Sequence, residues 1–186
     1  MKKVLLIAAM AFVSVAGFAQ KFAHVNFSEL VQLCPEADQA RATISASSNE
    51  AQETYQAMVD EFNTKYQTYQ QKASTWTQAI RESKEKELTE IQQRIQEFSQ
   101  TVQAELQQQE QQLMAPIYEK ANNAVQELAK AGGYVYVFDQ SAPLYIDPAQ
   151  STDLTPAARK ALNIPADRTL ESLQAELQAA AQAAQQ

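Results

Sequence analysis

The sequence predicts a mainly α-helical protein with a small β-stranded body. Between Glu36 and Ala115 the chain contains no glycine and no proline, and apolar side chains recur there every three or four residues. Alternating steps of three and four average about 3.5 residues, which is the spacing of a coiled-coil seam. Short segments with the composition of β-strands lie on both sides of this region. We therefore expect a long helical arm and a short-stranded sheet in one chain.

Residues 1–19 have the pattern of a signal peptide. Lys2 and Lys3 precede an apolar run over residues 4–16, and small residues follow at the two positions that a signal peptidase reads. The apolar run is short for a permanent membrane span, although a retained anchor is the alternative. We expect cleavage after Ala19, so that an exported mature protein begins at Gln20.

The mature chain is expected to be distinctly acidic. The full sequence has 15 Lys and Arg against 22 Asp and Glu, for a net charge of -7. Removal of the leader deletes two lysines and no acids, so the net charge becomes -9. Basic side chains that neutralise phosphates supply most of the affinity for nucleic acids. Nucleic acid is therefore not an expected partner, and an anionic membrane surface is disfavoured for the same reason.

The sequence contains few residues suited to catalysis or metal binding. Cys34 is the single cysteine, and we interpret it as a small buried apolar residue rather than an intermolecular or redox thiol. His24 is the single histidine and is expected on the wetter face of a strand. Nothing pairs it with Cys34 as base and nucleophile, and no cluster of ligands suits a metal. We predict no catalytic residue, no cofactor and no enzymatic activity.

Three short strands are expected, at Lys21–Phe27, Tyr134–Asp139 and Leu144–Asp147. The first alternates in polarity, the second is rich in β-forming residues, and the third follows a turn signal at residues 141–143. Gly132 and Gly133 are expected to end the helix that precedes the second strand. Three short strands cannot bury a sheet face alone, and their open edges favour pairing with another chain.

The helical region, residues 36–130, is expected to fold back as an antiparallel hairpin. A single helix of that length would extend about 140 Å and would separate the first strand from the second. The apolar stripe lapses between Ile80 and Leu88, where most residues are charged. We therefore place the tip of the hairpin near residues 78–86.

A tip at that position predicts a register for the two helices. The numbers of facing residues then add up to about 168, so that Tyr55 faces Leu113 and Phe62 faces Leu106. Pro116 lies inside the returning helix, where a kink or local break is expected.

The C-terminal region adds two helical signals. Asp153-Leu154-Thr155-Pro156 has the composition of a helix N-terminus, which predicts a short helix over residues 157–162. Leucines at 170, 173 and 177 form a second stripe that fades into alanine and glutamine, so the tail is expected to dock at its start and fray at its end. The predicted division is residues 1–19 signal peptide, 20–35 and 131–165 β body and trimerisation region, 36–130 hairpin arm, and 166–186 helical or disordered tail.

Several of these segments together resemble the Skp/OmpH family of periplasmic chaperones for outer-membrane proteins. The resemblance rests on FAHVNF in the first strand, on residues 113–139 with Pro-Ile before the last helical stretch and Gly-Tyr before the second strand, on SAPLYID and on the closing DLTPAARKAL. It covers roughly residues 21–163. Coiled-coil regions match many unrelated proteins, so the flanks that carry the strands contribute most to it.

The resemblance implies a homotrimer in which strands from three subunits close a small β-barrel, from which three hairpins project around a cavity. Family members hold unfolded outer-membrane β-barrel proteins in that cavity without ATP, in the periplasm, and prevent their aggregation before insertion. This chain is accordingly predicted to be a holdase chaperone. The alternative is a non-enzymatic periplasmic coiled-coil scaffold or adaptor of an envelope assembly.

The charge of the hairpin departs from the family pattern. The best-known members are strongly basic, whereas residues 49–115 carry eleven acidic and six basic side chains here. Electrostatic capture of anionic lipid is therefore not expected, and apolar and amide contacts should matter more in client binding. Large aromatic residues on the seam first pack the hairpin, but two helices cannot bury them completely. We predict that the exposed edges of Trp76, Tyr69 and Tyr66 contact clients.

Overall fold

The computed structural model describes residues 20–183, so the predicted signal peptide lies outside the described residues. Its elements follow one another as β1 (Lys21–Val25), α2 (Phe27–Leu33), α3 (Pro35–Lys72), a single 3₁₀ turn (Ala73–Thr75), α4 (Gln78–Gly132), β2 (Tyr134–Asp139), β3 (Ser151–Asp153), α5 (Thr155–Ala161) and α6 (Leu170–Ala183). The chain divides into a strand unit (residues 1–35 and 118–186) and a hairpin unit (residues 36–117). The prediction of long helices with a small sheet is confirmed.

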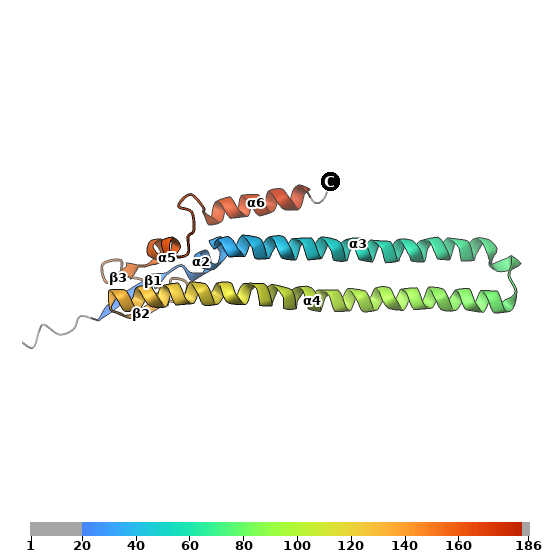
Figure 1. The fold of residues 1–186 in the computed structure, drawn as a ribbon, viewed down its shortest axis with the longest axis horizontal. Coiled ribbons are helices and arrows are strands. Elements are labelled where there is room, and N and C mark those ends of the chain that lie inside the picture. Colours follow the sequence, from blue (N-terminus) through green and yellow to red (C-terminus); the bar gives the residue numbers. More distant parts are fainter. Residues whose placement is uncertain (1–19, 184–186) are drawn as a thin grey trace, which may run out of the picture. The chain divides into compact units, whose positions relative to one another are not determined.

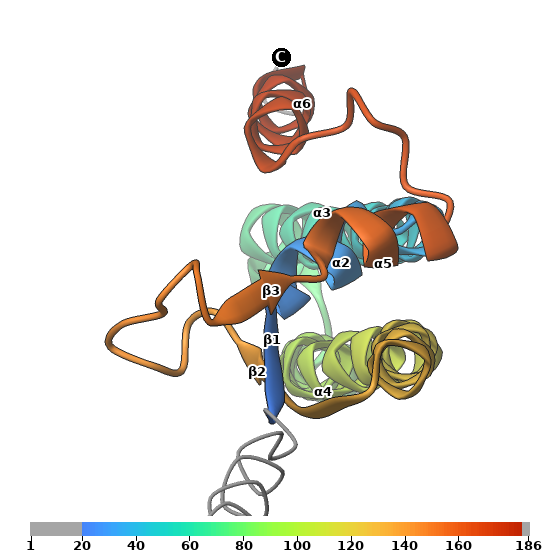
Figure 2. The same cartoon turned by 90° about the vertical axis from the view of Figure 1, so that its left-hand side faces the viewer.

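The sheet of the strand unit has three parallel strands in the order β2-β1-β3 (Figure 2). Along β1, Ala23 pairs with Val137 of β2 and with Thr152 of β3. The sheet is open, because β2 and β3 each have one edge that pairs with no strand of residues 20–183. A closed barrel is therefore not formed by one copy of the described residues.

One face of this sheet covers the core of the strand unit. Ala23 and Val25 of β1 are buried, and α2 and α5 lie on one side of the sheet (Figure 2). Leu30, Leu33 and Leu162 are the largest of the fully buried side chains around them. Cys34 is also fully buried, as the interpretation of a small apolar residue required.

The third predicted strand is wrong. Residues 144–147 are irregular, and β3 instead lies at Ser151–Asp153. The segment STD lacks apolar alternation, but it runs beside the free edge of β1, where the Leu154 amide also donates to the His24 carbonyl at 2.9 Å. Backbone pairing decides this strand, whereas residues 144–147 do not join the sheet formed by the described residues.

The first predicted strand is too long, because Phe27 begins helix α2. Asn26 caps this helix: its Oδ1 accepts from the Glu29 amide at 3.1 Å, and its Nδ2 donates to the Glu29 carboxylate. The backbone N–H of Asn26 donates a hydrogen bond to Thr155 Oγ1 at 3.0 Å. Arg159 of α5 forms an ion pair with Glu29. The Asp-Leu-Thr segment thus joins β3, α5 and the start of α2.

The predicted tip at residues 78–86 is wrong. Helix α3 ends at Lys72, the chain turns over residues 73–77, and α4 is helical from Gln78 onward (Figure 1). Thr77 starts α4, since its carbonyl accepts from the Arg81 amide at 3.1 Å and its hydroxyl accepts from the Ile80 amide at 3.4 Å. The charged residues after position 80 belong to the first turns of α4 because a charged helix face is stable in water.

The position of the turn also changes the register. Lys65 pairs with Glu87 and Glu61 with Arg94, so the numbers of facing residues add up to about 152 to 155 instead of 168. The predicted pairs of Tyr55 with Leu113 and Phe62 with Leu106 are therefore wrong. Two apolar stripes of similar spacing fit several registers, and the turn together with the ion pairs selects one.

The sequence offered two signals that a helix ends, a proline at 116 and glycines at 132 and 133, and only the glycines end α4. Pro116 lies inside α4, which stays helical on both sides, so the predicted local break does not occur. Ile117 and Ala121, just after the proline, are buried, and this packing favours continuation of the helix. Gly133 follows the helix at φ 67°, a left-handed conformation that glycine adopts without strain, and its amide donates to the Lys130 carbonyl.

The leucine stripe of the tail forms helix α6, as expected. Leu173 is buried and α6 contacts α2, whereas Leu177 is exposed. Thr169 and Ser172 cap the helix through reciprocal hydrogen bonds of 3.0 Å between side chain and backbone. The helix is therefore buried only in its first turn, at Leu173.

Candidate functional site

The turn of the hairpin gathers two of the three aromatic residues that the sequence singled out. The rings of Tyr69 and Trp76 meet edge to face, with centroids 6.0 Å apart. Tyr66 lies apart from them and stacks on Phe62 at 5.8 Å, with 43% of its surface exposed. Tyr69 and Trp76 are half-buried. All three rings thus pack against a neighbour and retain an accessible edge.

Polar contacts between α3 and α4 hold this end of the hairpin together. The Tyr69 hydroxyl donates to the Glu85 carboxylate, and this hydrogen bond raises the pKa of Tyr69. Lys65 donates to Glu87, which also accepts from Lys84 at 2.8 Å. These two hydrogen bonds lower the pKa of Glu87 to about 2. The turn is therefore fixed by charged groups as well as by the aromatic pair.

The hairpin unit separates its charges along its length. The part nearest the turn, residues 65–94, carries six basic and four acidic side chains. Farther from the turn, we call residues 42–64 and 95–117 the shaft; residues 36–41, which include Arg41, are not part of it. The shaft has no Lys or Arg and seven acidic residues: Glu50, Glu53, Asp60, Glu61, Glu97, Glu105 and Glu110. The aromatic pair at the turn thus lies in a locally cationic part of an acidic chain.

A second surface lies on the face of the sheet that α2 and α5 leave open. The rings of Phe22 and Tyr136 stack in parallel at 6.3 Å, and the rings of Tyr136 and Phe138 lie 6.0 Å apart. Tyr136 is 58% exposed and Phe138 is 46% exposed. These three residues, which we call the aromatic face, form a row of large rings across β1 and β2.

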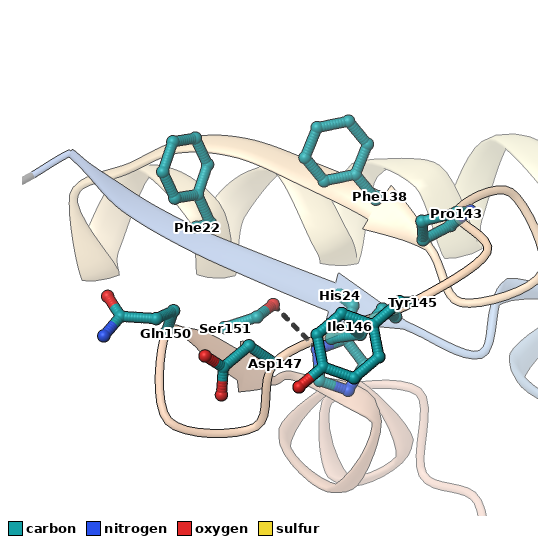
Figure 3. A pocket seen from close by; sticks show the side chains of 9 residues that line it. All are labelled: Phe22, His24, Phe138, Pro143, Tyr145, Ile146, Asp147, Gln150 and Ser151. Atoms are coloured by element: carbon teal, nitrogen blue, oxygen red, sulfur yellow. Dashed lines mark hydrogen bonds between the residues drawn. The ribbon is translucent and has the colours of Figure 1, made fainter.

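The loop between β2 and β3, residues 140–150, forms a pocket with this face (Figure 3). The pocket has a volume of about 210 Å³ and is open to solvent. His24 lies in it, with Nδ1 2.9 Å from Ser151 Oγ. Most of its walls are apolar or aromatic; the lining residues are Phe22, His24, Phe138, Pro143, Tyr145, Ile146, Asp147, Gln150 and Ser151.

The same loop carries the most exposed apolar side chains of the strand unit. Leu144 is fully exposed, and 77% of the Tyr145 surface is accessible. Figure 2 shows the loop extending away from the sheet on the side opposite α2 and α5. Asp139 fixes the start of the loop, where hydrogen bonds from the Ser141 hydroxyl and amide lower the pKa of the Asp139 carboxyl.

The described residues offer no arrangement for metal binding or for membrane crossing. Within residues 20–183, no three His, Cys, Asp or Glu side chains come together in a way that would hold a metal ion. None of the helices described there combines the length and the apolar character that a membrane span requires.

The prediction from sequence missed the aromatic face. A signal for it was present, because Phe22 and His24 alternate with the buried Ala23 and Val25, and Tyr136 and Phe138 repeat the same spacing on β2. A strand that is apolar on both sides is typical of a sheet covered on both faces. Among the described residues, helices cover only one face of this sheet.

Known proteins are similar to this chain over the region that contains its strands and its long helices. The sequence profile of the OmpH-like outer membrane protein family matches residues 21–162. A search of curated proteins found no match. A crystal structure of a Caulobacter crescentus CB15 protein, assigned as an outer membrane chaperone (OmpH-like), is similar with a TM-score of 0.68 and 18% identity, over 77% of this chain and 84% of that one. The matched region contains β1 to α5, and the chain belongs to the OmpH-like family.

Proposed function

We propose that this chain is an ATP-independent holdase of the periplasm, which binds unfolded outer-membrane proteins and prevents their aggregation before membrane insertion. The family match over residues 21–162 carries this proposal. The similar Caulobacter protein is assigned as an outer membrane chaperone, which agrees with it. The leader of residues 1–19 supports export, with cleavage after Ala19.

The working form in this proposal is a homotrimer. Three parallel strands with two open edges and an uncovered row of aromatic rings leave apolar surface and backbone groups without partners in a single copy. Three copies that share these edges would close a small barrel. The aromatic face, the pocket and the exposed Leu144 and Tyr145 would then line the contacts between subunits.

The hairpins of the three copies would surround the client. Trp76, Tyr69 and Tyr66 keep exposed edges near the turn, where aromatic rings can contact an unfolded chain weakly and reversibly. The shaft, with its seven carboxylates and no cations, would repel acidic segments and anionic lipid. Client contact is therefore concentrated at the turn, and many weak contacts from three hairpins supply the affinity.

Two measurements on the mature chain, residues 20–186, test this function. We expect sedimentation to give the mass of three chains. We also expect light scattering of a urea-diluted outer-membrane barrel protein to fall when the chain is present without nucleotide. A monomer that leaves aggregation unchanged would contradict the proposal. A trimer without this effect would instead favour a scaffold or adaptor of the envelope.

A further inference from the structure

The end of the hairpin carries positive charge that its own ion pairs do not neutralise. Residues 62–81 contain three basic side chains and no acidic one. One of the three, Lys65, is paired with Glu87 across the hairpin. The other two, Lys72 and Arg81, are exposed and form no ion pair with any residue in the described part of the chain. These two charges are therefore available to a partner.

Both unpaired cations belong to the same stretch of chain as the aromatic pair. Lys72 is the last residue of α3, and Arg81 is in the first turn of α4. The hydrogen bond to Glu85 raises the pKa of Tyr69, and the positive charge of Arg81 opposes this rise, so Arg81 is near the Tyr69 hydroxyl. Trp76, whose ring meets that of Tyr69 at 6.0 Å, is half-buried in the turn between α3 and α4. We call Tyr69, Lys72, Trp76 and Arg81 the cationic turn.

The charge of the cationic turn contrasts with that of the shaft. The first acidic side chain after the turn is Glu82, which accepts a hydrogen bond from Gln78 at 2.8 Å, and Glu85 accepts one from the Tyr69 hydroxyl. With these acids counted, residues 65–94 have six basic and four acidic side chains, for a net charge of +2. The shaft has seven acidic side chains and no basic one. The electrostatic energy of an anionic segment is therefore lower at the cationic turn than along the shaft.

We propose that the cationic turn selects client segments that carry aromatic and acidic side chains together. The inference rests on the proposed holdase function and names the part of the client that the turn binds. Aromatic side chains of an unfolded segment pack on the accessible edges of Tyr69 and Trp76. Carboxylates beside them pair with Lys72 and Arg81, which have no competing partner in the hairpin. A segment rich in lysine or arginine is repelled at the same place.

The fluorescence of Trp76 measures binding at the turn directly, because it is the only tryptophan of the chain. The mature chain, residues 20–186, is titrated with short unstructured peptides of equal length. One contains phenylalanine and aspartate, one has lysine in place of each aspartate, and one has serine in place of each phenylalanine. We expect the first to shift the Trp76 emission and to bind at least about fivefold more tightly than the others. High salt should remove its advantage over the lysine peptide, because the charges are exposed.

Two double variants test which charges matter. Lys72→Gln with Arg81→Gln removes the unpaired charges and keeps the aromatic pair. We expect its dissociation constant for the phenylalanine–aspartate peptide to rise about fivefold and its preference over the lysine peptide to disappear. Lys84→Gln with Lys86→Gln is the matched control, because it removes the same charge at side chains that already form ion pairs within α4. Its dissociation constant should change less, and circular dichroism confirms that both variants fold.

The outcomes separate this inference from the proposed holdase function. A chain that prevents aggregation of a barrel protein but binds the aspartate and lysine peptides equally keeps the holdase function and loses the inference. The inference is also lost if no peptide changes the Trp76 emission, or if both double variants weaken binding equally. Displacement of the first peptide by phosphatidylglycerol vesicles, with a larger shift of Trp76, would make an anionic membrane the partner and overturn it. A chain with the expected peptide preference that fails to prevent aggregation would overturn the holdase function instead.

Discussion

The strand unit and the hairpin unit of this chain are stabilised in different ways. The strand unit encloses Leu30, Leu33, Cys34 and Leu162 almost completely between a sheet and several short helices. The hairpin unit buries far less. Among the described residues between positions 41 and 116, Ile91 is the one apolar side chain that is buried, and polar side chains cover most of the two helices. The first unit depends on a packed core, and the second depends on helix continuity, a narrow seam and a few polar contacts.

This difference suggests a division of roles between the units. A packed core holds the strands and the aromatic face in one geometry, which a specific contact between copies requires. Two helices with a thin seam change conformation at little cost, which suits reversible contact with clients of varied size. Each of the following predictions tests whether a substitution affects one unit and spares the other.

The largest effect is expected at the aromatic face. Replacement of Tyr136 and Phe138 together by serine removes two exposed rings without disturbing the buried side of the sheet. If the proposed trimer forms through this face, we expect it to be lost at micromolar concentration, measured by sedimentation, with helix content unchanged. Leu177→Ser on α6 is the matched control, because it also removes an exposed apolar side chain. A trimer that survives the double substitution would place the contacts between subunits elsewhere.

An apolar side chain should contribute more to the free energy of unfolding in the strand unit than in the hairpin unit. Leu30→Ala creates a cavity at a fully buried position and should lower the free energy of unfolding by about 2 to 5 kcal/mol. Leu106→Ala in the shaft, where the side chain is half-buried, should cost about 1 kcal/mol, since less apolar area is lost. Urea unfolding followed by circular dichroism measures both values. Equal losses would contradict the contrast between a packed core and a thin seam.

Removal of the aromatic pair at the turn should impair client binding only. Tyr69→Ala combined with Trp76→Ala is expected to weaken the holding of an unfolded barrel protein by about tenfold, because aromatic anchors carry much of the energy in contacts of this kind. The proposed trimer should persist, as measured by its mass. Tyr55→Ala is the control, since it removes an exposed ring from the shaft. Unchanged holding in the double variant would exclude the turn as the site of client contact.

The smallest effect is expected from the ion pair between the two helices. The pKa of Glu87 is lowered to about 2 in the folded hairpin, so its contribution to stability is present above the ordinary value of 4.5 and is lost as the pH falls towards 2. Glu87→Gln should slightly lower the melting temperature at neutral pH, and added salt should abolish the difference. Glu90→Gln, which removes a pair within α4 only, is the control. If Glu90→Gln lowered the melting temperature as much as Glu87→Gln, the ion pair between the two helices would add nothing to the stability of the hairpin.

Local patterns were sufficient to predict several parts of the fold. The 3.5-residue stripe gives two long helices because few other structures tolerate so many glutamines and glutamates on an exposed face. The β-forming residues of YVYVFD and the two glycines before them place β2 and the end of α4. The leucine stripe after residue 169 gives α6 in the same way. Each of these features depends on residues that are near one another in sequence.

The candidate site was predicted less completely than the fold. Trp76 and Tyr69 were singled out from the stripe, and the structure places them in contact. The aromatic face combines β1 and β2, which are more than 100 residues apart, so no local pattern reports that Phe22 meets Tyr136. The same holds for His24 and Ser151, which share one pocket because β3 returns to the edge of β1.

The sequence by itself determined that this chain has long amphipathic helices, two of its three strands and an acidic surface, because helix periodicity, strand propensity and charge are local properties. Tertiary structure alone decided the turn at residues 73–77, the strand at 151–153 and the irregular path of residues 144–147. These depend on which partner a segment meets. Cross-hairpin ion pairs select one of several registers, and a free backbone edge on β1 recruits a segment with little strand propensity of its own.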